Sequence, residues 1–416
     1  MPIGYDGYFY ERYGTINLYG RLKGGGIIYH DGSDNYAALQ LYGDNSGFTG
    51  TFIAKMRSGN HRLAFMTQQS GSGNANWLLD ANGNDCQRLL LGNGTLNFGS
   101  LSGRGLIRND ATGSVIISIG ALNSNTNYSG TLSQANANDK VGVDKVGTGT
   151  LIFSGNNTYA LATTVQNGTF LLNNNASTGV FSSPVIVNAG AFGGMGKSQN
   201  TVTVGIGNGI GAAFIPGTDG TVGTFTTTST VTLNADAMYK VDINSIAGTT
   251  DQIVAGSVIL NNPQLVIADI GSGSITTGTS FTIINNTGTA AVSGTFNNFP
   301  EGSNVLLNNV NFKISYVGGD GNDVTLTNVG LTTDNSDKES SAFRVYPNPV
   351  KDYLVVTWNM PMESQNKMQL FDINGRILRS CVIGGFPYSW NLKDIAPGMY
   401  FLKMDGISDL KKIVKQ

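Results

Sequence analysis

The stretch GTLIFSGNNTYALATTVQNGTFLLN, residues 149–173, contains the pattern that decides the fold. Apolar and polar residues alternate in 149–155 and again in 163–173, and Gly or Asn residues interrupt the alternation. Alternation with a period of two is typical of a strand with one buried face, whereas Gly and Asn are typical of tight turns. The stretch therefore predicts short strands joined by turns, without helices.

The same pattern recurs from about residue 14 to residue 328, for example in 39–52, 94–99, 127–132, 201–204, 230–233 and 258–260. An all-β chain with degenerate repeats can form an array of sandwiches or a solenoid. We favour the solenoid, because it explains why only 12% of the residues are charged: inward side chains stack on one another, while Asn and Thr occupy turns and outer faces. Coils of about 20–25 residues would give about 13–16 turns.

The composition excludes several classes of function. The net charge of −2 provides no basic surface, so we expect no nucleic-acid partner. No run of 18 apolar residues is present. Cys86, Cys381, His30 and His61 are too few for a disulfide framework or a cysteine-rich zinc site, and neither histidine lies in a known catalytic motif. We therefore expect no cofactor and no catalytic residue, and we predict that the chain is not an enzyme.

Residues 147–159 (GTGTLIFSGNNTY) and 163–173 (TTVQNGTFLLN) resemble the autotransporter-associated β-strand repeat, although 160–162 (ALA) replace its usual Thr-Gly step. Residues 251–326 resemble the closing coils of such proteins. The resemblance implies a right-handed parallel β-helix, residues 1–328, exported to a bacterial surface, with a degenerate match over 1–90. Because residues 1–6 show no basic segment followed by an apolar one, we expect the signal peptide to lie upstream of an N-terminally truncated chain.

The composition changes after residue 328. Residues 329–341 are polar and predict a linker, and 341–416 contain 10 Lys and Arg against 6 Asp and Glu. Asn374 and Gly375 lie between two apolar segments, which predicts a hairpin with a type I′ turn, both central residues having positive φ. Residues 342–416 therefore predict a small β-sandwich.

This segment resembles the type A C-terminal sorting domain of the type IX secretion system of Bacteroidota. The residues that match its motifs are Tyr346, Pro347, Asn348, Pro349, Asp372, Asn374, Gly375, Arg376, Pro397, Gly398, Tyr400, Lys411, Lys412 and Lys415.

The resemblance implies an Ig-like sandwich that the outer-membrane translocon recognises and a sortase removes. The cargo would then be attached to surface lipopolysaccharide or released. We expect the two prolines, Pro347 and Pro349, to keep the linker from pairing into the sheet, and the terminal lysines to face an acidic receptor.

Three groups of side chains are candidates for binding or chemistry. Asp320 and Asp323 lie in GGDGNDVTL, 318–326, which nearly fits a calcium-binding nonapeptide but has no tandem copy, so we expect the final β-helix turn instead. Asp219, Asp236, Asp242 and Asp251 lie in separate strands or turns, and we expect them to be scattered and structural. Tyrosines are concentrated near the N-terminus, and their rings are candidates for stacking on sugar rings: Tyr8, Tyr19, Tyr29 and Tyr42.

These observations predict a secreted or cell-surface β-helix protein, an adhesin or structural stalk, whose ligand is a glycan or another host- or cell-surface group. The alternative is the non-catalytic C-terminal part of a larger secreted polysaccharide-degrading enzyme or protease. An upstream catalytic domain would favour the alternative, and upstream repeats would favour the adhesin.

Overall fold

The computed structural model describes residues 7–11, 14–32, 37–56, 62–81, 86–175, 177–209, 211–331, 343–358, 366–383, 387–404 and 410–416. The chain divides into two compact units, residues 1–332 and residues 333–416. The described ranges contain one short 3-10 turn, η1 (Gln68–Ser70), and no helix long and apolar enough to cross a membrane.

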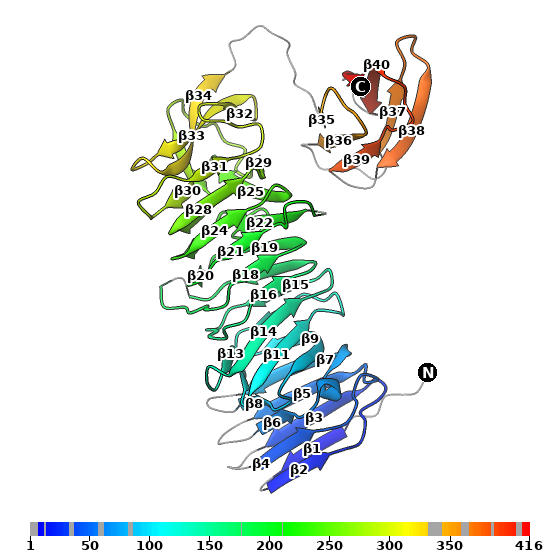
Figure 1. Cartoon of the computed structure of the whole chain (residues 1–416), viewed down its shortest axis with the longest axis vertical. Helices are drawn as coiled ribbons and strands as arrows, with labels where there is room; N and C mark the ends of the chain where they lie inside the picture. Colours follow the sequence, from blue (N-terminus) through cyan, green and yellow to red (C-terminus); the bar gives the residue numbers. More distant parts are fainter. Residues whose placement is uncertain are drawn as a thin grey trace. The chain divides into compact units, whose positions relative to one another are not determined.

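The first unit is a parallel β-solenoid, as the alternation predicts (Figure 1). Its first ladder of parallel strands contains β1 (Gly7–Glu11), β3 (Ile27–Gly32), β5 (Thr51–Met56), β7 (Ser72–Ala81), β9 (Gly94–Gly103), β12 (Thr126–Tyr128), β15 (Thr150–Phe153), β17 (Thr169–Leu172), β19 (Gly190–Gly194), β22 (Ala212–Pro216), β25 (Ala237–Asn244) and β29 (Gln264–Asp269). Partners in this ladder lie 19 residues apart at Phe153 and Leu172 and 26 apart at Tyr239 and Leu265, close to the coil length expected.

Two further ladders complete the coils. The second runs from β9 through β11 (Gly113–Ile119), β14 (Asp139–Lys145), β16 (Thr163–Val165), β18 (Val185–Val187), β21 (Val202–Val204), β24 (Thr230–Leu233) and β28 (Ser257–Asn261) to β31 (Ser293–Thr295). The third has two parts: β2 (Gly14–Leu18), β4 (Ala37–Leu41), β6 (Arg62–Phe65), β8 (Cys86–Leu89), β10 (Leu106–Asn109) and β13 (Thr131–Gln134), and then β20 (Lys197–Ser198), β23 (Thr224–Thr227), β27 (Gln252–Ala255) and β30 (Ser280–Asn286).

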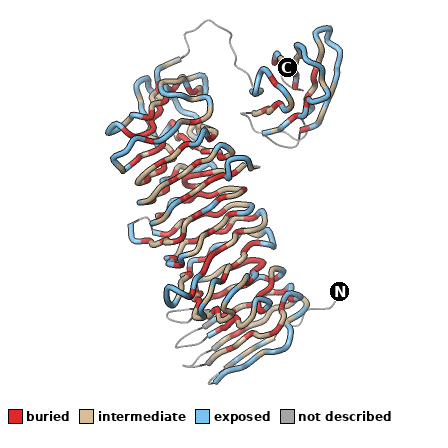
Figure 2. Tube along the Cα trace, viewed as in Figure 1, coloured by how far each residue is buried: buried red, intermediate tan, exposed pale blue. Residues whose placement is uncertain are grey.

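The core is built by stacking like residues on successive coils. Phe170, Phe192 and Phe214 are fully buried, with ring centroids 5.8 and 5.5 Å apart, and Tyr239 follows 6.1 Å beyond Phe214. Figure 2 shows buried residues recurring from coil to coil, except on the first coil, where the described residues of β1 and β2 are exposed or intermediate. Each coil therefore covers the apolar side of the coil before it, and the ladder supplies the backbone hydrogen bonds.

The C-terminal end of the solenoid differs from the expected closing coils. Strands as far as β31 continue the parallel ladders, but the chain after β31 forms the antiparallel strands β32 (Asn304–Leu307), β33 (Val310–Gly318) and β34 (Asp323–Leu331), and β34 pairs with β30. The short strand β26 (Thr249–Thr250) also pairs antiparallel, with β25. The estimate of 13–16 turns is too high, because these residues form a cap rather than coils.

The second unit contains two antiparallel sheets that enclose one apolar core, consistent with the predicted β-sandwich. One sheet contains β35 (Phe343–Tyr346), β36 (Tyr353–Trp358) and β39 (Tyr388–Asn391). The other contains β38 (Ile377–Ile383), β37 (Asn366–Phe371), β40 (Gly398–Met404) and β41 (Leu410–Lys415). Of the expected linker, 329–331 belong to β34 and 332–341 lie outside the described residues.

Candidate functional site

Asn348 joins the first and last motifs of the second unit. Its Oδ1 accepts a hydrogen bond from Val414 N (2.8 Å), and its Nδ2 donates one to Lys412 O (2.7 Å). Its amide thus takes the place that a backbone amide of a neighbouring strand would take beside β41. Val350 extends the pairing, because its N donates to Val414 O (2.7 Å) and its O accepts from Gln416 N (2.8 Å). The expected motif residues 346–349 and 411–415 therefore form one structural site.

The two prolines of this site lie after a strand of the sandwich. Residues 343–346 form β35 and pair with β36, so Pro347 and Pro349 follow the first strand of the sandwich. The expectation that they keep the linker from pairing into the sheet stays a prediction, because 332–341 lie outside the described residues. Since proline lacks an amide hydrogen, Pro347 and Pro349 end β35 and leave Asn348 to make the contacts with β41.

The terminal lysines are not one exposed basic surface. Lys411 and Lys415 are only 6% and 7% exposed, and Lys415 Nζ donates to Gln416 O, whereas Lys412 is exposed. Side chains alternate across a strand, so Lys411, Ile413 and Lys415 share the inner face of β41. The expectation that all three lysines face a receptor is wrong. The alternation of 411, 413 and 415 around a central isoleucine already indicated that Lys411 and Lys415 lie on the buried face.

The hairpin between β37 and β38 forms as predicted, but its turn differs. Gly375 has φ +79°, and Asn374 is not among the residues with positive φ, as a type I′ turn would need. Gly375 N donates to Asp372 O (3.0 Å), and Asp372 Oδ1 accepts from Asn374 N and Arg376 N (both 2.9 Å). Asp372 thus closes a type I turn followed by a left-handed glycine, a common alternative for hairpins.

The remaining motif residues lie at the start of β40. Tyr400 OH donates to Ala396 O (2.7 Å), which ties the strand to the turn that contains Pro397 and Gly398. Close to that turn, Arg379 of β38 pairs with Asp394 and donates to Asn391 O. These contacts connect β38 and β40 to the segment that precedes Pro397 and Gly398, and they are structural.

The four candidate tyrosines for glycan binding form two stacked pairs. Tyr8 lies over Tyr29 with centroids 4.7 Å apart, and Tyr19 lies over Tyr42 at 4.6 Å. Tyr8 and Tyr19 are each 70% exposed. Each ring covers one face of its partner. A ligand beside a pair would therefore contact ring edges and hydroxyl groups rather than a row of exposed ring faces.

Three of the four aspartates are close together, so the expectation of scattering is wrong. Asp251 Oδ2 accepts from Asp242 N (2.9 Å), its Oδ1 accepts from Gly223 N (2.7 Å), and Asp242 Oδ2 accepts from Gly220 N (2.7 Å). Asp219 pairs with Lys240 at 3.5 Å. Burial, together with the charges of Asp242 and Asp219, raises the pKa of Asp251 to about 7.

Asp242 and Asp251 are structural in their contacts, because Asp242 accepts a hydrogen bond from Gly220 N and Asp251 accepts them from Gly223 N and Asp242 N. Asp236 is separate and accepts from the backbone N of Ile206, Gly207 and Gly209 at 3.1, 2.7 and 2.8 Å.

The candidate calcium residues lie in the β33–β34 hairpin of the cap, not in a final β-helix turn. Gly318 pairs with Asp323, and Asp323 Oδ1 accepts from Asn286 N (2.9 Å). An antiparallel hairpin offers Asp320 and Asp323 no equivalent loop on a next coil. In the described ranges, no three His, Cys, Asp or Glu side chains are grouped so that they could hold a metal ion.

Two features of the solenoid were not anticipated. Lys145 is fully buried, and its Nζ donates to Val146 O, Gly147 O and Asn167 O at 2.8, 2.9 and 3.1 Å. A lysine at an inward strand position was the only sequence signal. His30 is buried in β3, whereas His61 lies outside the described residues.

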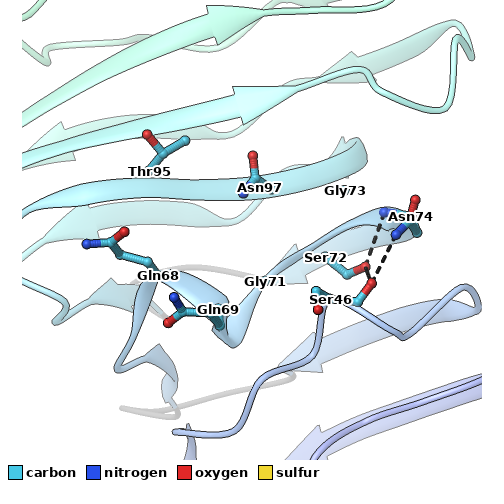
Figure 3. A pocket seen from close by; sticks show the side chains of 9 residues that line it. All are labelled: Ser46, Gln68, Gln69, Gly71, Ser72, Gly73, Asn74, Thr95 and Asn97. Atoms are coloured by element: carbon cyan, nitrogen blue, oxygen red, sulfur yellow. Dashed lines mark hydrogen bonds between the residues drawn. The ribbon is translucent and has the colours of Figure 1, made fainter.

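The second feature is a pocket of about 360 Å³ at the corner between β6 and β7 (Figure 3). Its lining residues, all uncharged, are Ser46, Gln68, Gln69, Gly71, Ser72, Gly73, Asn74, Thr95 and Asn97. They come from three successive coils, so no local motif could have predicted the pocket.

Comparison with known proteins finds a family match in the second unit. Residues 344–416 match the family model of the secretion system C-terminal sorting domain, and no curated protein matches the chain. The match implies export by the type IX secretion system, to the cell surface or the extracellular space, and interaction with its machinery. The autotransporter-associated repeat remains a prediction for the solenoid, whereas the C-terminal unit is similar to a type IX sorting domain over residues 344–416.

Proposed function

We propose that the chain is a non-enzymatic secreted solenoid that works at a bacterial surface as an adhesin or stalk after its C-terminal unit has been removed. The observation that carries this proposal is that the two units have separate apolar cores. The cap formed by β32, β33 and β34 closes the solenoid before residue 332. Removal of the second unit would therefore leave the core of the first unit covered.

The solenoid suits a spacer or binding surface. Its parallel ladders and continuous apolar core give a stiff body, because each coil is held by backbone hydrogen bonds to the next coil. Asp242 and Asp251 are nearly fully buried and accept backbone hydrogen bonds, which favours a structural rather than a catalytic role.

Most motif groups of the sorting domain are exposed to the machinery. They are residues 346–349, the Asn374–Arg376 turn, Pro397, Gly398 and Lys412, whereas Lys411 and Lys415 are buried. We propose that the outer-membrane translocon and its sortase act on this unit, with attachment to lipopolysaccharide or release as the two fates of the cargo.

The test is mass spectrometry of the mature C-terminus, from the surface and medium fractions of a host with a type IX system. We expect a C-terminus within 328–345, carrying a glycolipid or free. An isogenic strain without the translocon should retain uncleaved chain in the periplasm, and so should the wild-type host expressing a chain without 343–416. An intact Gln416 on the surface protein would contradict removal, and surface display of the truncated chain would contradict sorting.

A further inference from the structure

We propose that the pocket between β6 and β7 binds a segment of a neutral glycan, with the Tyr19–Tyr42 pair extending the same site. This inference deepens the proposed adhesin role by naming a ligand class and a place. It is tested on purified protein, so its outcome is independent of export.

The pocket is held by hydrogen bonds between coils. Asn74 Nδ2 donates to Ser46 O (3.0 Å), Ser72 Oγ donates to Phe48 O (2.7 Å), and Gln68 Nε2 donates to Asn93 O (3.1 Å). Its floor needs a glycine, because a Cβ at Gly71 would lie 2.5 Å from Asn97 O. The hollow is therefore part of the coil geometry and exists before a ligand binds.

Polar groups without an internal partner line this hollow. In the part of the chain that the structure describes, the side chains of Gln69, Thr95 and Asn97 are exposed and make no hydrogen bond. Together they offer two amides and one hydroxyl, each able both to donate and to accept. Hydroxyl groups of a sugar also donate and accept, so this set matches a carbohydrate. The volume lies at the lower end of the range of about 300–1,000 Å³ for ligand pockets.

The lining of the pocket favours a neutral ligand. No lining residue is charged, so a uronate or phosphate would find no cation within the pocket. Beside the rim, Ser46 Oγ donates to Asp44 Oδ1 (2.6 Å). This hydrogen bond and the charges of Arg21 and Lys23 lower the pKa of that carboxyl group, so the rim carries charges of both signs. A neutral sugar avoids the cost of leaving a charge unpaired.

The tyrosine pair lies along the same corner of the solenoid. Thr67 Oγ1, next to Gln68, donates to Tyr42 O (3.3 Å), and Tyr42 stacks with the exposed Tyr19 on the preceding coil. A chain of sugars leaving the pocket toward the N-terminus meets the edges of these rings. This arrangement connects the amide pocket with the aromatic residues proposed from the sequence.

The experiment is a glycan array containing neutral and acidic oligosaccharides, followed by calorimetric titration of the strongest neutral ligand. Gly73→Leu fills the pocket, since a Cβ at Gly73 meets Asn97 Cβ at 3.7 Å, an ordinary contact distance. Gln69→Ala and Asn97→Ala remove single hydrogen bonds, and Tyr19→Ala removes the exposed ring. Thr224→Ala, at an exposed strand position of a distant coil, is the matched control.

We expect Gly73→Leu to abolish binding, Gln69→Ala and Asn97→Ala each to weaken it about 3- to 10-fold, and Thr224→Ala to leave it unchanged. Circular dichroism and thermal melting establish that each variant is folded. If Gly73→Leu is not folded, the affinities of Gln69→Ala and Asn97→Ala test the proposal instead. The proposal is overturned if no neutral glycan binds, if only acidic glycans bind, or if folded pocket variants retain full affinity.

Discussion

The solenoid and the sorting domain connect their residues over different distances along the chain. In the solenoid, Phe192 packs against Phe170 and Phe214, each 22 residues away, and the same relation repeats on coil after coil. In the sorting domain, Asn348 bonds to backbone groups 64 and 66 residues away. A solenoid can therefore tolerate degenerate coils, whereas the sandwich depends on a few contacts between its first and last motifs.

The largest effect should follow from breaking the aromatic ladder of the solenoid. Phe192→Ala would leave a cavity bordered by Phe170, Phe214 and Phe225, and we expect a loss of about 3–5 kcal/mol. Hydrogen exchange read by mass spectrometry on the full chain should show increased exchange in 165–240 and none in 343–416. Increased exchange in the sorting domain would contradict the independence of the two cores.

A second effect is a pH dependence located in the solenoid. The pKa of Asp251 is raised to about 7 by burial, so the folded chain retains a proton that the unfolded chain loses near pH 4. The unfolded state then binds fewer protons, and stability should fall as pH rises from about 4 to 7 and level off above pH 7. Each unit of difference between the folded and unfolded pKa is worth about 1.4 kcal/mol, so the free energy of unfolding should fall by on the order of a few kcal/mol.

Urea unfolding at a series of pH values, before and after Asp251→Asn, checks this prediction. The variant should flatten the slope of the unfolding free energy against pH between pH 4 and 7. Its stability should be lower at every pH, because the asparagine NH2 group would face Asp242 N, a donor that Asp251 Oδ2 accepts from. The control Asp236→Asn changes a carboxylate with backbone donors and a lowered pKa, and should leave that slope in place. An unchanged slope in Asp251→Asn would contradict the assignment.

A smaller effect concerns the buried amine of the solenoid. Lys145→Met keeps most of the side-chain volume but leaves three carbonyl oxygens without their donor, and we expect a loss of about 1–3 kcal/mol. Lys140→Met, at an exposed position of the same strand, should change stability by less than about 0.5 kcal/mol. Equal effects of the two variants in urea unfolding would show that the three carbonyl contacts contribute nothing.

The features that the sequence predicted correctly depend on local contacts, and those that it missed depend on distant ones. Alternation and turns such as those at 149–173 are local, and they predicted the coils. The Asn374-Gly375 pair is also local, and it predicted the hairpin between β37 and β38 but not its turn type. The antiparallel cap, the meeting of Asp219, Asp242 and Asp251, and the pocket around Asn97 depend on which coils become neighbours. That choice is made by packing, so the sequence pattern could not show it. Lys411 and Lys415 are the exception, since the period of two already placed them beside Ile413.

The smallest effect we predict is confined to the sorting domain. Asn348→Ala removes two hydrogen bonds to the backbone of β41, and we expect a loss of about 1–2 kcal/mol, because Val350 continues to pair with that strand. Faster hydrogen exchange should appear at 410–416 and not in the solenoid. Lys412→Ala is the control, since it removes an exposed side chain and keeps the carbonyl that Asn348 binds. If the two variants exchange alike at 410–416, then the Asn348 amide does not hold the last strand, and backbone pairing through Val350 alone fixes it.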